Sequence, residues 1–118
     1  LMAAARRDFF LTVQHGQFYQ GNPVIGYDLP GFGDELCGLP YLPRLIAKAR
    51  AKLVGSMGDD IIYCCENDRR FFRDYGNIHP ADFLRVVWAA GDSDPKVYDY
   101  VRQRTLSVSS AVPDNEQM

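Results

Sequence analysis

Three cysteines and two histidines are the side chains in this 118-residue chain best suited to chemistry. Cys64 and Cys65 are adjacent, while Cys37, His15 and His79 lie far from them along the sequence. Zinc sites are commonly marked by C-x2-C or H-x3-H spacing, and neither occurs, so we expect no metal and no other cofactor. What remains is thiol chemistry, as in a small enzyme or a thiol-based sensor that uses Cys64 or Cys65.

A cysteine nucleophile needs a base, and the sequence offers little support for one. His79 directly precedes Pro80 at a predicted helix start, where its imidazole is better placed to cap than to catalyse. Both cysteines end the apolar run 61–65, where successive side chains point to opposite faces, so packing of one thiol explains them as well. We recognise no Ser-His-Asp order, phosphate-binding glycine loop or paired catalytic carboxylates. The sequence favours a protein that is not an enzyme, and the thiol alternative stays open.

A basic helix face is the strongest predicted surface feature. Residues 42–76 carry seven Lys or Arg and five Asp or Glu side chains, although the whole chain has a net charge of −2. Such a patch would attract an acidic protein partner, or, as a further alternative, a nucleotide or another anion. The competing interpretation is a solvated face whose arginines pair with Asp68 and Asp74. The predicted binding residues are Arg44, Lys48, Lys52, Arg69, Arg70 and Arg73.

Exposed aromatic side chains form a second predicted contact surface. Residues 1–40 are interrupted every few positions by Gly or Pro and are predicted to form an extended arm, although residues 3–14 are also compatible with a short helix. The arm has too many large apolar side chains for a free linker, so it must lie against its own domain or another subunit. The predicted contact residues in the arm and on an apolar helix edge are Phe18, Tyr19, Tyr27, Phe32 and Trp88.

Four helices are predicted to position these residues in an all-α or mainly α domain. Pro43 and Gly55 bracket the first helix, because proline suits a first turn and glycine suits the left-handed residue after the last. Its predicted core face is Leu42, Leu45, Ile46, Ala49 and Leu53. Asn67 or Asp68 can cap the second helix, which Gly76 ends. The helices cover residues 43–54, about 68–75, 80–90 and 95–105, and a short extended segment at 61–65 has no evident strand partner.

Length and composition bound the remaining choices. A chain of this length fits one domain that buries roughly 65% of the surface of its unfolded form. We divide it into the arm, a helical domain at 41–105 and a polar tail at 106–118. No apolar run approaches the length of a membrane-spanning helix. The small net charge argues against nucleic acid as a partner.

Compartment is predicted from the cysteines and the first residues. An odd cysteine number with an adjacent pair indicates an intracellular, reducing compartment. The opening LMAAARR is rich in alanine and arginine and free of acids, as in an organellar transit peptide, so the compartment is cytoplasmic or organellar.

One combination of motifs resembles a known family. It consists of Leu42-Pro43-Arg44-Leu45-Ile46-x-Lys48-Ala49-Arg50-Ala51, then Gly55, Gly58, Tyr63, Cys65, Asp68-x-Arg70-Phe71-Phe72 and Gly76. Over residues 38–105 the chain resembles domain-of-unknown-function family five-zero-six-nine, whose members are short and mainly bacterial. The resemblance implies a small, mostly helical domain and no accepted activity. The chain departs from the family pattern at Glu66-Asn67, where Pro-Leu is common, and in its long arm and polar tail.

These observations together predict a non-enzymatic accessory subunit. We expect it to dock on other protein subunits of a larger complex through its arm, its tail and its basic helix face.

Overall fold

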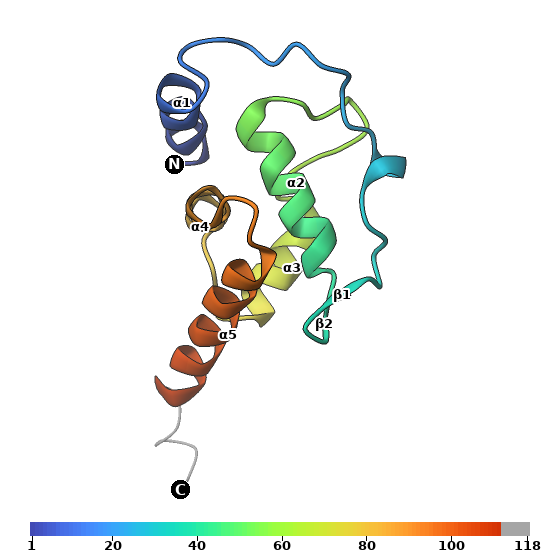
Figure 1. The fold of residues 1–118 in the computed structure, drawn as a ribbon. Coiled ribbons are helices and arrows are strands. Elements are labelled where there is room, and N and C mark those ends of the chain that lie inside the picture. The colour runs from blue at the N-terminus through green and yellow to red at the C-terminus, as the bar shows by residue number, and fades with distance from the viewer. Residues whose placement is uncertain (112–118) are drawn as a thin grey trace, which may run out of the picture.

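The computed structural model describes residues 1–111, which form a mainly helical fold with one short hairpin (Figure 1). The predicted mainly α fold is therefore confirmed. All four predicted helices are present, and a fifth forms within the predicted arm. None of the helices in this described part is long and apolar enough to cross a membrane. The elements are α1 (Met2–Thr12), the 3-10 turn η1 (Gly26–Asp28), β1 (Glu35–Leu36), β2 (Leu39–Pro40), α2 (Leu42–Val54), α3 (Glu66–Asp74), α4 (Pro80–Ala90) and α5 (Asp94–Ala111).

The helix α2 runs through the middle of the fold and contacts α1, α4 and α5 (Figure 1). Pro43 occupies its first turn, where a missing amide hydrogen costs nothing, and Gly55 ends it with a left-handed φ of 79°. The predicted core face is confirmed, because each of its residues is at most 2% exposed. These residues are Leu42, Leu45, Ile46, Ala49 and Leu53.

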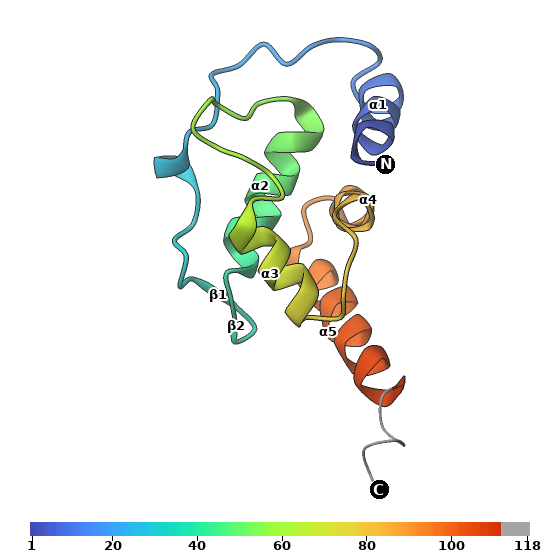
Figure 2. The same cartoon turned by 180° about the vertical axis from the view of Figure 1, so that it is seen from behind.

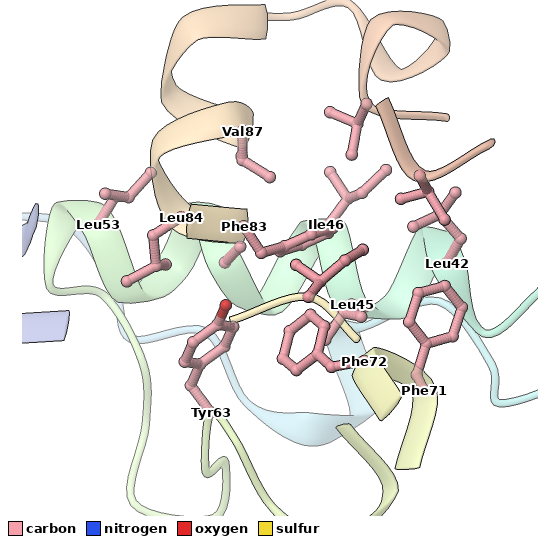
Figure 3. Close-up of a cluster of buried hydrophobic side chains, with 14 of the residues drawn as sticks. Leu42, Leu45, Ile46, Leu53, Tyr63, Phe71, Phe72, Phe83, Leu84 and Val87 are labelled. Carbon is pink, nitrogen blue, oxygen red and sulfur yellow. The ribbon is translucent and has the colours of Figure 1, made fainter. Parts of the chain in front are cut away.

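Helices α3 and α4 supply the aromatic part of the core. The ring centroids of Phe72 and Phe83 lie 5.3 Å apart, and Tyr63 packs beside Phe72 at 6.3 Å. Figure 3 shows these rings gathered against the apolar side chains of α2. His79 begins α4 by accepting a hydrogen bond from the amide of Ala81 at 3.0 Å, which confirms its predicted capping role.

The helix α1 packs against α2 and α4 (Figure 1). Ala5 is fully buried, and the ring of Phe9 meets that of Trp88 edge-on at 5.3 Å. Arg6 Nε donates to the carbonyl of Lys52 at 2.8 Å, which satisfies a carbonyl that has no partner within α2. The beginning of the predicted arm therefore belongs to the helical domain, and its own domain provides the surface that it needs.

The end of the helical domain also differs from the prediction. Helix α5 continues to Ala111, so the predicted end of the last helix at residue 105 is wrong, and residues 112–118 of the predicted tail lie outside the described residues. Close packing of α5 on the turn after α3 depends on Gly76. Its φ is +99°, and a Cβ there would lie only 3.0 Å from backbone atoms of Arg104 and Thr105. Only glycine meets both requirements.

The chain between α1 and α2 crosses the end of α2 and returns along its other side (Figures 1 and 2). Val24 forms an isolated parallel bridge with Met57, which ties this segment to the loop after α2. The antiparallel hairpin of β1 and β2, with Leu36 paired to Leu39, then leads directly into α2. This part of the predicted arm is irregular, as expected from its glycines and prolines.

Residues 61–65 alternate in burial as an extended segment should. Ile61 and Tyr63 are buried, and Ile62 between them is 66% exposed. The segment forms no strand, however, and Cys64 has a left-handed φ of 72°. The predicted extended run is therefore wrong at Cys64, where the backbone turns to begin α3.

Candidate functional site

A buried lysine forms the centre of the candidate site. Lys48, on α2, is 4% exposed, and its ammonium contacts Asp68 near the start of α3. Lys48 Nζ lies 2.9 Å and 3.1 Å from the two carboxylate oxygens of Asp68, and 3.4 Å from Cys65 Sγ. An ammonium has three N–H donors, so these three acceptors satisfy all of them.

Asp68 is fully buried, and its carboxylate accepts hydrogen bonds from several parts of the chain. The hydroxyl of Tyr41 donates at 2.5 Å, and the amides of Cys64 and Cys65 donate at 2.8 Å and 3.3 Å. An acid in the first turn of a helix suits the positive end of the helix dipole. The residue that caps α3 is Cys65, so the prediction that Asn67 or Asp68 occupies the cap position is wrong.

Two residues with a left-handed backbone conformation lie beside the same carboxylate. Tyr41 and Cys64 both have positive φ, 74° and 72°, although neither is glycine. A left-handed conformation costs roughly 1–2 kcal/mol for an ordinary residue. Both residues donate a hydrogen bond to Asp68, from the Tyr41 hydroxyl and from the Cys64 amide. These bonds explain why the strained conformations persist, and why the predicted extended segment bends at Cys64.

A cavity of about 200 Å³ adjoins the ion pair. Phe32, Ile61 and Ile62 give it an apolar lining. Its polar lining comes from Tyr41, Arg44, Lys48, Asp60, Cys65 and Asn67. Cys65, whose thiol is free, lines this cavity and is partly exposed.

Burial near Asp68 favours the protonated forms of Tyr41, Tyr63 and Cys64. Burial, followed by the hydrogen bond to Asp68, raises the pKa of Tyr41 well above its usual value. Burial, followed by the charge of Asp68, does the same to the pKa of Tyr63. Burial also raises the pKa of the Cys64 thiol, although the charge of Arg69 opposes this shift. The two tyrosines therefore act as hydrogen-bond donors.

The predicted basic face is not a single surface. Its prediction is wrong at Lys48, which is buried against Asp68, and the predicted pairing of Asp68 with arginines is wrong for the same reason. Arg44 is half-buried, with its guanidinium carbon 4.2 Å from the ring centroid of Phe32. Lys52 is also half-buried.

The three predicted arginines of α3 remain exposed at the surface. Arg69 donates to the carbonyl of Cys64, and Arg70 makes a loose exposed pair with Glu66 at 3.7 Å. Arg73 is exposed near the end of α3. The structure therefore separates the six predicted basic residues into a buried one, two half-buried ones and three exposed ones.

The predicted aromatic residues divide in a similar way. Phe18, Tyr27 and Phe32 are 75%, 93% and 56% exposed, and Tyr19 is 41% exposed. Trp88 instead packs on Phe9 and is half-buried. The four aromatic residues predicted as contacts in the arm are thus exposed at the surface.

Two residues of the site, Tyr41 and Asp68, were not predicted as site residues. The available signal was the position of Lys48 beside the core residue Ala49. A charged side chain that is buried there requires a partner of opposite charge. Cys65, predicted as a thiol candidate, does lie at the site. The histidines do not join it, and residues 1–111 contain no group of three His, Cys, Asp or Glu side chains that could hold a metal ion.

The family comparison covers this site except for Phe32. A model described as "Domain of unknown function (DUF5069)" matches residues 33–112. The chain belongs to the DUF5069 family. The DUF5069 region begins at the end of the irregular segment and includes the ion pair, Tyr41 and both neighbouring cysteines, whereas α1 precedes it. Searches among curated proteins and among solved structures gave no match.

Proposed function

We propose that this DUF5069 protein is a non-enzymatic accessory subunit that docks on a basic protein surface of a larger assembly. The observation that carries the proposal is an exposed surface rich in both apolar side chains and acids, here named the acidic aromatic face. It consists of Tyr27, Asp28, Phe32, Asp34, Glu35, Asp59, Asp60 and Ile62, all of them exposed. The chain has no lysine or arginine between Arg7 and Arg44, so the segment before α2 brings only acidic charges to this face.

Hydrogen bonds join the two segments that make up this face. The amide of Gly26 donates to Asp60 at 2.9 Å, and the amide of Gly58 donates to the carbonyl of Val24 at 2.7 Å. Phe32 and Ile62 line the same cavity, although they lie in different loops. The face is thus already assembled in the free chain, which reduces the entropy that docking must offset.

The chemistry of the face indicates the chemistry of its partner. Exposed aromatic side chains serve as anchors at protein interfaces because they bury much apolar surface with few rotatable bonds. Arg44 stacks on Phe32 and holds that ring in place. The surrounding carboxylates speed the approach of a basic partner and repel an acidic one. The partner that fits is a protein surface with arginine or lysine around apolar pockets.

This proposal reverses the charge of the partner expected from the basic helix face. Lys48 is buried in an ion pair with Asp68, and Arg44 contacts the ring of Phe32 and donates to the carbonyl of Pro30 at 3.0 Å. The alternative of an anion or nucleotide at that patch loses support for the same reason. We place the assembly in a reducing compartment, in keeping with three cysteines that are all free.

The test uses tagged chains in an extract of the source cells, separated by size-exclusion chromatography. We expect the native chain to elute with a larger assembly, and Tyr27→Ser to shift it to the position of a free 13.4 kDa protein. The pair Glu35→Lys and Asp59→Lys should do the same, with at least roughly tenfold weaker association at low salt. Neither of these two carboxylates makes a hydrogen bond within residues 1–111, so the fold is preserved.

Leu11→Ser is the matched control, because Leu11 is also 53% exposed but lies on α1, across α2 from η1 (Figure 1). It should leave the elution unchanged. Elution of the native chain as a free protein, or retention of both face variants in the assembly, would contradict the proposal.

A further inference from the structure

We propose that Cys65 is a reactive thiol that small hydroperoxides oxidise to a sulfenic acid. The proposal is independent of docking and rests on the cavity, the ion pair and the contrast among the three cysteines. None of these features is explained by the proposed accessory role.

The first observation is the contact between Cys65 and a cation. Lys48 gives two of its N–H donors to Asp68, and its third points to Cys65 Sγ at 3.4 Å. Asp68 in turn accepts from Tyr41 and from the amides of Cys64 and Cys65, so its charge is shared among several donors. A cysteine sulfur beside a lysine ammonium, partly exposed at the start of a helix, is in surroundings typical of reactive thiols.

The second observation is access to the sulfur for a small molecule. Cys65 lines the cavity of about 200 Å³ and is partly exposed, whereas Lys48 and Asp68 are buried. The positive charges of Arg44 and Lys48 are balanced by Asp60 and Asp68, so the site has no net formal charge. A cavity of this size and charge has room for a small neutral oxidant such as hydrogen peroxide.

The other two cysteines lack this combination. Cys64 is adjacent, but burial raises the pKa of its thiol. Cys37 is exposed in the turn of the hairpin and makes no hydrogen bond with a cation in the described part of the chain. Cys37 is therefore an exposed thiol without a neighbouring cation. Comparing its rate of oxidation with that of Cys65 separates the effect of the Lys48 ammonium from the effect of exposure.

The reaction balances without a further reactant. The sulfur of Cys65 attacks one oxygen of the hydroperoxide, and the S–O bond forms as the O–O bond breaks. The sulfur loses two electrons, and the hydroperoxide is reduced to water or an alcohol. The proton of the original thiol ends on the leaving oxygen.

The test exposes the folded native chain to hydrogen peroxide, traps sulfenic acid with dimedone and locates the adducts by mass spectrometry. At early times we expect at least tenfold more adduct at Cys65 than at Cys37, in spite of the greater exposure of Cys37. Cys64→Ser should keep this reactivity and Cys65→Ser should remove it, which assigns the adduct within the adjacent pair. Equal or faster reaction at Cys37, or reaction mainly at Cys64, would overturn the proposal.

The role of the cation is tested by Lys48→Met combined with Asp68→Asn, which removes both charges together. In a chain that circular dichroism shows to be folded, the rate at Cys65 should fall to about that of Cys37. An unchanged rate in the folded double variant would refute assistance by Lys48. Should the double variant not fold, the comparison of the three cysteines in the native chain still decides whether Cys65 is the reactive thiol.

Discussion

Lys48 and Asp68 present the clearest energetic question at the scale of single residues. Removal of one partner from a buried ion pair leaves the other charge without compensation. We therefore expect Lys48→Met and Asp68→Asn each to lower the free energy of unfolding by about 3–5 kcal/mol. Together they should cost less than the sum of the two single losses. Urea unfolding of the four chains in a double-mutant cycle measures the difference.

The exposed pair of Glu66 and Arg70 is the control for this cycle, because its charged groups are 3.7 Å apart and face solvent. Glu66→Gln should change the free energy of unfolding by less than about 0.5 kcal/mol. Strictly additive losses at Lys48 and Asp68 would show that the pair is not energetically coupled, contrary to the buried contact.

Tyr63 provides a pH-dependent prediction at the same scale. Its side chain is 6% exposed, its hydroxyl donates to the carbonyl of Pro80 at 2.8 Å, and burial raises its pKa. Above about pH 10 the unfolded chain releases this proton while the folded chain keeps it, so stability falls as the pH rises. Each retained proton contributes a slope of about 1.4 kcal/mol per pH unit.

We expect Tyr63→Phe to remove about that slope between roughly pH 10 and pH 11.5, since the unfolded chain then has one proton fewer to release. Free energies of unfolding from urea titrations at several pH values give both slopes. Identical slopes for the native chain and the variant would show that Tyr63 ionises equally in both states.

At the scale of elements, the packing of α1 against the core can be tested directly. Ala5 is fully buried in the core cluster, while Ala4 on the same helix is exposed. Ala5→Leu should therefore lower the free energy of unfolding by about 1–3 kcal/mol through overpacking. Ala4→Leu should change it by less than about 0.5 kcal/mol. Equal effects in urea unfolding would mean that α1 does not pack as described.

Two side chains from the start of the chain also complete the end of α2. Arg6 donates to the carbonyl of Lys52, and Gln14 donates to that of Val54 at 3.0 Å. These carbonyls belong to the last turn of α2, where backbone acceptors have no helical donors. The contact between α1 and α2 thus satisfies backbone polarity as well as burying apolar surface.

At the scale of the whole molecule, the sequence predicted features that depend on neighbouring residues and missed those that depend on distant contacts. Pro43, Gly55, Pro80 and Gly76 act on their own neighbours, so helix ends near them were predictable. The position of Lys48 was not, because a charged side chain is placed in solvent by default and its partner is 20 residues away. Tyr41 gave no signal either, since tyrosine rarely adopts the left-handed conformation that aims its hydroxyl at Asp68.

The distribution of charge over the surface could not be predicted from local sequence patterns either. The arginines and lysines of α2 and α3 appeared to form one basic face because a helical wheel assigns directions but not partners. The structure gives Arg44 and Lys48 partners within the fold, which leaves the acidic segment before α2 as the more uniform surface. Exposure of Phe18 and Tyr27 likewise depends on which neighbours the irregular chain reaches.

Phe32 is part of the acidic aromatic face and also lines the cavity that contains Cys65. Its ring touches Arg44 on one side and packs near Tyr41, at 5.8 Å between centroids. Under the proposed docking, a substitution at Phe32 would change partner recognition and the surroundings of the thiol together. Natural selection on either property therefore acts on the other, and the two would be expected to diverge in step among related proteins.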